Sequence, residues 1–513
     1  MLPEEILDGL KKRILPQWSV CFWSALAVGL LTHMYKLTNW LPNWDSLVFR
    51  YDPQNMLGLG RWLLPVACAG SSFYDLPWLN GLLAIVFHAL GAVCICRMFA
   101  VRKTITAALI GAMVISFPTV TSVMLYNYVA DGYALSFLLA CMAASCLTEE
   151  KPKYVAGVVL IVLSVGIYQA YITVTIMLLL CWLVCRTIQS NEDVKKTLAR
   201  GAKLLIAGAL GMALYYLVLT VLLKVTGTQL LEYQGVDASF SLSELDLWAS
   251  LYTIKQSLVA FFFDRSGGWA VLHVINGMVI AGTVAFYFYD AIKNRIGVRK
   301  LLLLAVCGLL LPIGASVLAL VNSRVDYHNL MKMGFCVFYL VFLLQYERTV
   351  FHSARHNGIK QWAILLISGA LVFNQTVIAN VSYHKLHIAY ERSYATLIRI
   401  ADRIEQTEGA ADCDKILVIG SLEQSQAYSA NVSLDMTGTT DGLILRADDE
   451  IVGQSVLCSA LNDYCATNYR FLAGAEKDAL LGQINEQTLD TWPDKGAVTV
   501  LNDVIVVKLG DEP

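Results

Sequence analysis

The chain has 513 residues, of which 57% are hydrophobic and only 15% are charged. This composition excludes an ordinary soluble globular protein and indicates a polytopic α-helical membrane protein. The formal net charge of −2 excludes little, because charge in a membrane protein acts through the side of the membrane on which it lies.

Apolar runs of about 20 residues, the length that crosses a hydrocarbon core of about 30 Å, recur along the chain. The first of them is predicted to be a span rather than a cleaved signal peptide, since no small-x-small cleavage site follows it. The run from 154 to 186 is too long for one helix, so we divide it at "YQAY" (168–171), whose polar and aromatic residues suit an interface. About eleven transmembrane helices are predicted, at residues 17–36, 78–98, 104–123, 132–148, 154–168, 171–186, 203–224, 269–290, 300–321, 332–346 and 361–381.

Basic residues gather in alternate loops of this arrangement, on the same side as the N-terminal "KKR" (11–13). By the positive-inside rule this side is cytoplasmic. The N-terminus is therefore expected inside and, with eleven spans, the C-terminus outside. The loops in question are "VRK" (101–103), "EEKPK" (149–153), "EDVKKTLARGAK" (192–203), "KNRIGVRK" (293–300) and "ERTVFHSARHNGIK" (347–360).

Three substantial pieces of the chain then fall on the outer side. They are a first outer loop at 37–77, a second outer loop at 225–268, and everything after residue 381. We therefore divide the chain into a multi-span membrane domain, residues 1–381, and an extracytoplasmic domain, residues 382–513.

The extracytoplasmic domain is predicted to be small and of the α/β class. Residues 383–406 carry apolar and aromatic side chains at helical spacing, which indicates an amphipathic helix leaving the membrane. "KILVIG" (415–420) and "AVTVLNDVIVVKL" (497–509) are typical of strands, the second as a hairpin that turns at Asn502-Asp503.

Three of the thirteen cysteines lie in this polar region. In an oxidising exterior, Cys458 and Cys465 are near enough in sequence for a local disulfide, with Cys413 left over or exchanging places. The alternative is three free thiols in a small domain.

The outer loops and outer span ends carry cations on the side where the positive-inside rule disfavours them. Ionisable groups at membrane depth are costly and often mark a substrate path. In the alternative, each cation snorkels or pairs with a neighbouring acid, as Arg265 can with Asp264. The cations are Lys36, Arg50, Arg61, Lys255, Arg265, Arg324 and Lys332, with His328 nearby, and the acids are Asp45, Asp52, Asp75, Asp131, Asp264 and Asp326.

Aromatic residues accompany these charges. They can line a sugar or lipid site, or they can form the aromatic belt that is common at membrane interfaces. They are Trp40, Trp44, Tyr51, Trp62, Phe73, Tyr74, Tyr126, Tyr128 and Tyr133.

Sugar transfer from a lipid-linked phosphate is a reaction that needs this combination of residues. The leaving phosphate is already anionic, so it requires cations rather than a general acid, and the planar fork of arginine suits phosphate oxygens. The acceptor hydroxyl is a poor nucleophile, so a carboxylate must take its proton. One base is enough for an inverting displacement, unlike the carboxylate pair of glycoside hydrolases.

Several short motifs carry a resemblance to a known family. "LPNWDSLVFRYD" (41–52) follows the first span, "GLGRW" (58–62) precedes the second, and "GIYQAY" (166–171) and "WPDKGAVTVLNDVIVVKL" (492–509) follow later. Together they resemble the bacterial Gtr-type glucosyltransferases that modify O-antigen and related surface glycans. The resemblance implies a C-type glycosyltransferase (GT-C) fold in the bacterial plasma membrane, with a polyprenyl-phosphate-linked sugar, typically glucose, as the donor on the outer face.

The resemblance also implies roles for individual residues. The catalytic acid of this fold class lies in the first outer loop, and the matching residue is Asp45 in "PNWD", with Asp52 as its competitor. The donor phosphate would be held by Arg61 together with Arg324, Lys332 or His328. The sugar pocket would be shaped in part by Tyr126, Asn127 and Asp131.

No cofactor is expected, and the enzyme is predicted to be metal-independent. Relatives of the wider class place two adjacent acids, or an acid-x-acid pair, in the first outer loop. Asp45 and Asp52 are seven positions apart, so no short-range cluster supplies the convergent oxygens that divalent ions prefer. The expected partners are the lipid-linked donor, a surface glycan acceptor and the bilayer, with no nucleic acid.

Two other classes of protein compete with this interpretation. A transporter or flippase also has many spans, but transporters usually bind at the midplane, whereas the predicted spans are nearly free of ionisable residues, with His88 as the main exception. An interaction protein anchored by its spans is the second alternative. The sequence contains no H-E-x-x-H, P-loop or Rossmann motif, so protease, nuclease and nucleotide-binding functions have no support.

Overall fold

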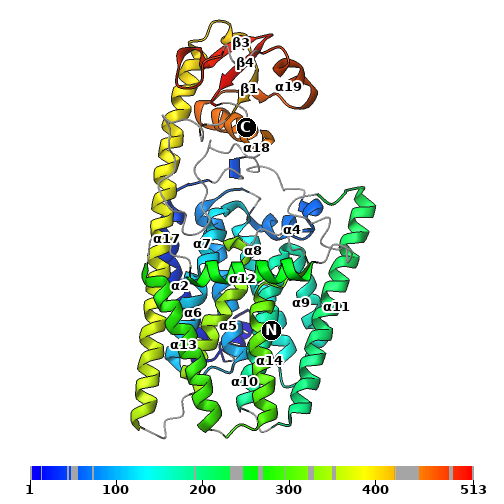
Figure 1. Ribbon diagram of the computed structural model, residues 1–513, viewed down its shortest axis with the longest axis vertical. Coiled ribbons are helices and arrows are strands. Elements are labelled where there is room, and N and C mark those ends of the chain that lie inside the picture. Colours follow the sequence, from blue (N-terminus) through cyan, green and yellow to red (C-terminus); the bar gives the residue numbers. More distant parts are fainter. Residues whose placement is uncertain are drawn as a thin grey trace. The chain divides into compact units, whose positions relative to one another are not determined.

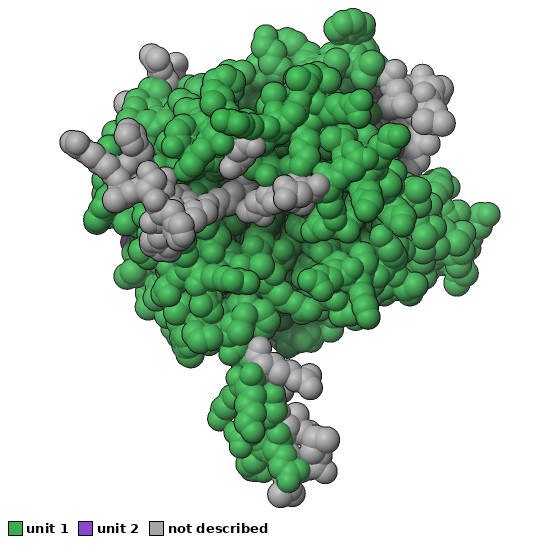
Figure 2. Space-filling model, turned by 90° about the horizontal axis from the view of Figure 1, so that it is seen from below, with its two compact units in different colours: residues 1–38, 53–380, 436–438 green, residues 39–52, 381–435, 439–513 purple. Residues whose placement is uncertain are grey.

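The computed structural model divides the chain into two compact units, each described by itself (Figure 1). Unit 1 comprises residues 1–38, 53–380 and 436–438, and unit 2 comprises residues 39–52, 381–435 and 439–513. Unit 1 is drawn in green in Figure 2. The residues that the structure describes are 3–12, 14–42, 46–47, 56–71, 74–189, 192–231, 246–263, 270–293, 295–321, 328–348, 354–420, 422, 450–484 and 489–510.

All the secondary-structure elements in the described part of unit 1 are helices. Its elements are α1 (Pro3–Lys11), α2 (Pro16–Thr38), η1 (Met56–Leu59), α4 (Leu64–Cys68), η2 (Ala69–Ser71), α5 (Pro77–Met98), α6 (Thr104–Ser116), α7 (Pro118–Leu125), α8 (Asn127–Thr148), α9 (Tyr154–Ile167), η3 (Gln169–Tyr171), α10 (Ile172–Gln189), α11 (Val194–Thr226), α12 (Leu247–Phe263), α13 (Ala270–Lys293), α14 (Val298–Ala315), α15 (Leu318–Val321), η7 (Asn329–Met331), η8 (Met333–Phe335), α16 (Cys336–Arg348) and the first half of α17 (Ala354–Glu405).

Among the described residues, eight helices are long and apolar enough to cross a membrane, or nine if the bent pair α6–α7 is one span. The protein is therefore a multi-pass membrane protein, as its composition predicts. About eleven spans were expected; the difference arises because the predicted spans 154–168 and 332–346 fall on α9 and α16, which have only 14 and 13 residues. The eight helices are α2, α5, α8, α10 (counted together with η3), α11, α13, α14 and α17.

The bend between α6 and α7 has a local cause. Pro118 begins α7, and a residue that precedes proline is driven out of the helical region by the ring of the proline. Phe117 accordingly has φ −59° and ψ 137°, and the two helices meet at 41°. The predicted span 104–123 is therefore two segments rather than one straight helix.

The predicted outer loop 225–268 contains a helix that the sequence analysis did not predict. In Figure 1, α12 runs across the direction of its neighbouring spans. It contacts α13, α14 and α15, and Trp248 at its start has 82% of its surface exposed. This orientation is typical of a helix that lies along a membrane interface.

Helices α8 and α9 are joined by two reciprocal hydrogen bonds. The Ser136 hydroxyl donates to the Ser164 carbonyl oxygen at 2.8 Å, and the Ser164 hydroxyl donates to the Ser136 carbonyl oxygen at 2.9 Å. Small polar residues that bond across helices let two spans approach closely in lipid. The pair fixes the register of α8 against α9.

Unit 2 contains a four-stranded sheet in the order β2-β1-β4-β3. Strand β1 (Lys415–Ile419) is parallel to β2 (Arg470–Phe471) and to β4 (Val504–Lys508), while β3 (Val498–Leu501) is antiparallel to β4. The predicted strands and hairpin are confirmed. Asn502 and Asp503 have φ of 50° and 57°, the left-handed pair that a two-residue hairpin turn requires.

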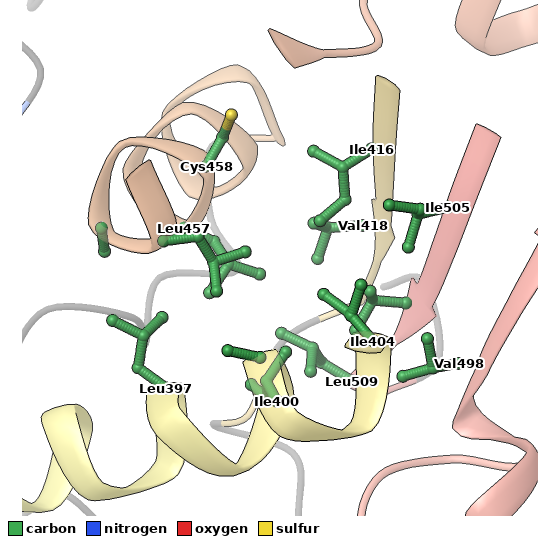
Figure 3. Packing of buried hydrophobic residues seen from close by; sticks show 14 of the residues in the cluster. Leu397, Ile400, Ile404, Ile416, Val418, Leu457, Cys458, Val498, Ile505 and Leu509 are labelled. Atoms are coloured by element: carbon green, nitrogen blue, oxygen red, sulfur yellow. The ribbon is translucent and has the colours of Figure 1, made fainter. Parts of the chain in front are cut away.

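The sheet of unit 2 is covered by helices that pack in two hydrophobic clusters. These are the second half of α17, α18 (Glu450–Cys465) and, against a smaller cluster, α19 (Gly474–Leu481). The predicted helix 383–406 is confirmed as part of α17, which is continuous with the last span. Figure 3 shows Leu397, Ile400 and Ile404 of α17 pointing toward residues of β1, β4 and α18.

Of the two alternatives for the cysteines of the domain, three free thiols is the one that the structure has, and the Cys458–Cys465 bridge is absent. Cys458 and Cys465 lie seven residues apart on α18, which separates their Cα atoms by about 10 Å along the helix axis, too far for a bridge. The thiol of Cys458 instead donates a hydrogen bond to the Tyr469 carbonyl oxygen at 3.0 Å, and burial raises its pKa to about 11.

Candidate active site

The motifs "GLGRW" and "GIYQAY", about a hundred residues apart in sequence, meet in unit 1. The side-chain amide of Gln169 donates to the Leu59 carbonyl oxygen at 2.7 Å and to the Tyr215 hydroxyl at 3.1 Å. The Tyr215 hydroxyl in turn donates to the Gly60 carbonyl oxygen at 2.9 Å. Side chains from η3 and α11 thus hold the backbone of the turn that precedes Arg61.

Gly60 is required in this turn for two reasons. Its φ is +74°, in the left-handed region that favours glycine. A Cβ atom at this position would also lie only 2.6 Å from Nε2 of Gln169 and 2.7 Å from the Tyr215 hydroxyl oxygen. The glycine therefore permits both the turn and its hydrogen bonds.

We expect Gly60→Ala to lower both thermal stability and transfer activity. The strained backbone alone costs about 1–3 kcal/mol, and the added methyl group displaces the two side chains that hold the turn. Gly70→Ala is the matched control, because a Cβ at Gly70 would meet nothing within 4 Å. Thermal inactivation midpoints and initial rates in detergent measure both effects, and equal behaviour of the two variants would contradict the expectation.

Arg61 follows this turn and lies against two stacked tyrosines. Its Nη1 donates to the Tyr133 hydroxyl at 2.9 Å, and its guanidinium carbon lies 4.9 Å from the centre of the Tyr168 ring. The rings of Tyr133 and Tyr168 stack with centroids 4.3 Å apart. Arg61 is only partly buried, and the two tyrosines orient its guanidinium. Contact with aromatic rings does not neutralise a cation, so the guanidinium can still bind an anionic ligand.

Trp62, the next residue, packs against the second motif. Leu63 N donates to the Gly166 carbonyl oxygen at 2.9 Å, and a Cβ at Gly166 would lie 2.6 Å from the Trp62 ring. The buried indole Nε1 of Trp62 has no hydrogen-bond partner in the part of the chain that the structure describes. Buried donors in proteins usually have a hydrogen-bond partner, either a protein group or an ordered water molecule.

Lys332 joins two short helices, η7 and η8, and His328 immediately precedes η7. Lys332 lies between η7 and η8 with 7% of its surface exposed, and η8 contacts η3 of the "GIYQAY" motif. The segment is fixed on α7 by Thr119, whose hydroxyl donates to the Asn329 carbonyl oxygen at 2.8 Å. The segment that carries Arg61 and the segment that carries Lys332 therefore both contact η3.

Asn127 and Asp131 are buried in α8 with partners of their own. Asn127 Nδ2 donates to Asp75 Oδ1 at 2.6 Å, and the Asn127 carbonyl oxygen accepts from Asn80 at 3.0 Å. Asp131 accepts from the backbone N–H of Gly132 and interacts with Ser71. These contacts join α8 to α5 and to the segment that carries Arg61. Tyr126 lies at the junction of α7 and α8.

The remaining predicted site residues lie outside the described residues. They are Asp45, Asp52 and Arg324. Within the described residues, no group of three or more His, Cys, Asp or Glu side chains could hold a metal ion.

The sequence analysis missed Tyr168, Gln169 and Tyr215 as site residues. The motif "GIYQAY" was noted for its resemblance to the glucosyltransferases and as a break between two spans, but none of its residues was given a role in the site. Tyr215 lies within an apolar helix and gives no sequence signal. Tyr133 was noted among the aromatic residues that line a sugar or lipid site or form an interfacial belt, without a contact to Arg61.

A family model described as "Glucosyl transferase GtrII" matches residues 34–345, more than half of the chain. The matched range includes "GLGRW", "GIYQAY" and Lys332. The chain belongs to the GtrII glucosyl transferase family. No curated protein and no solved structure matches it.

This GtrII glucosyltransferase therefore transfers a sugar from a donor to a glycan acceptor, and it does so as a multi-pass membrane protein. The family match ends at residue 345, so α17 and the sheet of unit 2 lie beyond it. The turn at Gly60 and the tyrosines around Arg61 lie within the matched range.

Proposed function

We propose that the protein is an inverting glucosyltransferase that moves glucose from a polyprenyl-phosphate donor to a surface glycan. The observation that carries this proposal is the position of Arg61, oriented by Tyr133 and Tyr168 where two motifs meet. A guanidinium held in this way is suited to bind phosphate oxygens. The next residue, Trp62, packs against Gly166 of the second motif and so helps to fix the segment that carries Arg61.

In the proposed reaction the acceptor hydroxyl oxygen attacks C1 of the glucose. The bond between C1 and the phosphate oxygen breaks, its electron pair stays on the phosphate, and the configuration at C1 inverts. Asp45 takes the hydroxyl proton, with Asp52 as the reserve base. Arg61, together with Lys332, His328 or Arg324, holds the phosphate as its charge increases.

The other assigned residues support this reaction indirectly. Asn127 and Asp131 shape the pocket through their contacts with α5 and with the segment that carries Arg61, and Tyr126 adds an aromatic wall. Since Asp45 and Asp52 are seven positions apart, transfer is expected without a divalent ion. The proposed reaction requires no cofactor.

The proposed site faces the outside of a bacterial plasma membrane. The basic loops support this orientation by the positive-inside rule, with the N-terminus in the cytoplasm and the C-terminus outside. A cytoplasmic nucleotide sugar cannot reach an outer site, whereas a lipid-linked donor can. A GT-C fold in residues 1–381 and an extracytoplasmic domain in residues 382–513 belong to the same proposal.

Reconstitution in lipid vesicles tests the donor. We expect the purified protein to consume polyprenyl-phosphate-glucose and to leave nucleotide-linked glucose unchanged, with and without EDTA. A panel with polyprenyl-phosphate-linked galactose and mannose defines the sugar. Consumption of nucleotide-linked glucose alone would contradict the donor assignment. Movement of an intact lipid-linked sugar across the bilayer without its consumption would favour a flippase.

A further inference from the structure

Two arginines of α17 lie against a single indole ring in unit 2. The guanidinium carbon of Arg399 lies 5.4 Å from the centre of the Trp492 ring, and that of Arg403 lies 5.8 Å from it. The two arginines are four positions apart, so they are neighbours on one face of the helix. Trp492 begins the motif "WPDKGAVTVLNDVIVVKL", to which the proposed reaction assigns no role.

Trp492 is a fixed platform for both arginines. It has only 5% of its surface exposed and belongs to the core cluster that contains Ile400 and Ile404 of α17. Its backbone N–H donates to the Lys508 carbonyl oxygen at 2.9 Å, which ties the start of the motif to strand β4. The two guanidinium groups therefore rest on a side chain that the core of unit 2 holds in place.

Within the part of unit 2 that the structure describes, no carboxylate pairs with either arginine. Arg403 donates through Nη1 to the Asp494 carbonyl oxygen at 3.1 Å, and the carboxylate of the adjacent Asp402 accepts from Gln406 at 2.9 Å. Arg399 is exposed to solvent. Like charges four positions apart on a helix repel each other, so an anion that contacts both guanidinium groups would stabilise the pair.

The chemistry of the pair suits an oxyanion. Each planar guanidinium carries several N–H donors in a fork that matches two oxygens of a phosphate or carboxylate. Contact with the indole restricts the position of each cation without neutralising its charge. Two cations held on one ring therefore form a ready binding site for one acidic group.

The position of the pair along α17 favours a glycan over a lipid headgroup. Lys385 is the first charged residue after the apolar stretch of α17, and Arg399 follows it by fourteen residues of continuous helix. At about 1.5 Å per residue this is about 21 Å along the helix axis. A headgroup layer is only about 5–8 Å thick, whereas a surface polysaccharide extends over such a distance.

We propose that Arg399 and Arg403, on the ring of Trp492, bind a phosphate or carboxylate group of the glycan acceptor. This inference rests on the proposed transfer of glucose to a surface glycan, and it makes that glycan acidic. It gives unit 2, whose helices and sheet lie beyond the family match, a part in acceptor recognition. The arginines hold the polymer by its charge and take no part in the chemical step.

Binding of soluble polysaccharides to the full-length protein tests the site. The protein is held in nanodiscs of phosphatidylcholine, and the probes are polygalacturonate, which carries carboxylates, and a phosphorylated mannan, with dextran as the neutral control. We expect the wild type to bind an acidic polymer and not dextran, with an affinity that falls as salt rises. Failure to bind either acidic polymer, or equal binding of dextran, would overturn the proposal.

Charge-removing variants locate the binding. Arg399→Gln combined with Arg403→Gln should lower the affinity for the acidic polymer about tenfold, since charge-assisted hydrogen bonds are lost. Arg470→Gln is the matched control, because it removes an exposed arginine of the same unit that pairs with Asp414, and it should change the affinity less than about twofold. Arg399→Gln alone, at an exposed position, covers the case in which the double variant does not fold, and should give an intermediate loss. Equal affinities of the arginine-pair variants and Arg470→Gln would contradict the assignment.

Phosphatidylglycerol added to the nanodiscs separates a glycan site from a lipid site. At about 0.15 M salt the charge of the membrane is screened within about 8 Å, so the wild type should keep its affinity for the acidic polymer. A fall to the affinity of the double variant would assign the pair to lipid phosphates and overturn the proposal.

The binding measurements use no sugar donor, so a wrong donor or base assignment leaves them intact. Transfer to a surface glycan gives a separate readout of the acceptor role. Polygalacturonate should inhibit the wild type in competition with the acceptor, and about tenfold more of it should be needed to inhibit the double variant. Equal inhibition of the two proteins would remove the acceptor role.

Discussion

Asp45→Asn should reduce glucosyl transfer by about 10²–10⁴-fold, the usual contribution of a general base. The amide is close in size to the carboxylate but cannot take the proton of the acceptor hydroxyl. We expect the donor still to bind, because the residues assigned to the phosphate are unchanged. Single-turnover transfer and equilibrium binding of polyprenyl-phosphate-glucose separate the two effects.

Asp52→Asn is the matched control for this variant. It makes the same chemical change seven residues away in the same loop, and it should cost less than about tenfold, since only one base is needed for an inverting displacement. A large loss at Asp52 together with an active Asp45→Asn would transfer the role of the base to Asp52.

Arg61→Ala should lower kcat/KM by about 10²–10³-fold, the cost of removing one donor to a developing oxyanion. Arg61→Lys keeps the charge but loses the planar fork and its stacking on Tyr168, so it should retain no more than about a tenth of the wild-type activity. Tyr133→Phe removes only the hydrogen bond to Arg61, and its effect should lie between wild type and Arg61→Lys. Initial rates at varied donor concentration measure all three.

Arg97→Ala serves as the control for the arginine variants. Arg97 is half exposed and pairs with Glu149 at 2.6 Å near the end of α5. Exposed ion pairs contribute about 0–1 kcal/mol, so transfer should remain within about twofold of the wild-type rate. Loss of transfer in Arg97→Ala as large as in Arg61→Ala would indicate a general effect on folding rather than on the phosphate.

The fold class could be predicted because lipid imposes a simple rule on sequence. Every backbone polar group of a span must be satisfied within the span, so long apolar runs become helices. The hairpin at Asn502-Asp503 was predictable because it, too, depends on residues close together in sequence. Its two turn residues determine its conformation. Span counting failed where a local feature interrupts the run, as at Pro118, or where the helix is as short as α9.

The meeting of the two motifs could not be predicted, because helical periodicity gives no information on which spans are neighbours. Gln169 was interpreted as an interface residue, although its amide bonds the turn at Leu59. The choice between a Cys458–Cys465 disulfide and free thiols stayed open in the sequence for a related reason. The polar sequence around Cys458 and Cys465 gave no clear helical pattern, so their separation along α18 was not apparent.

The paired serines of α8 and α9 have a consequence for biogenesis. These helices are consecutive in the chain, so their docking requires no span that is synthesised later. Tyr133 lies one turn from Ser136 on α8, and Tyr168 follows Ser164 by four residues at the end of α9. The docking of these two helices therefore brings the two rings to a centroid distance of 4.3 Å, beside which Arg61 lies.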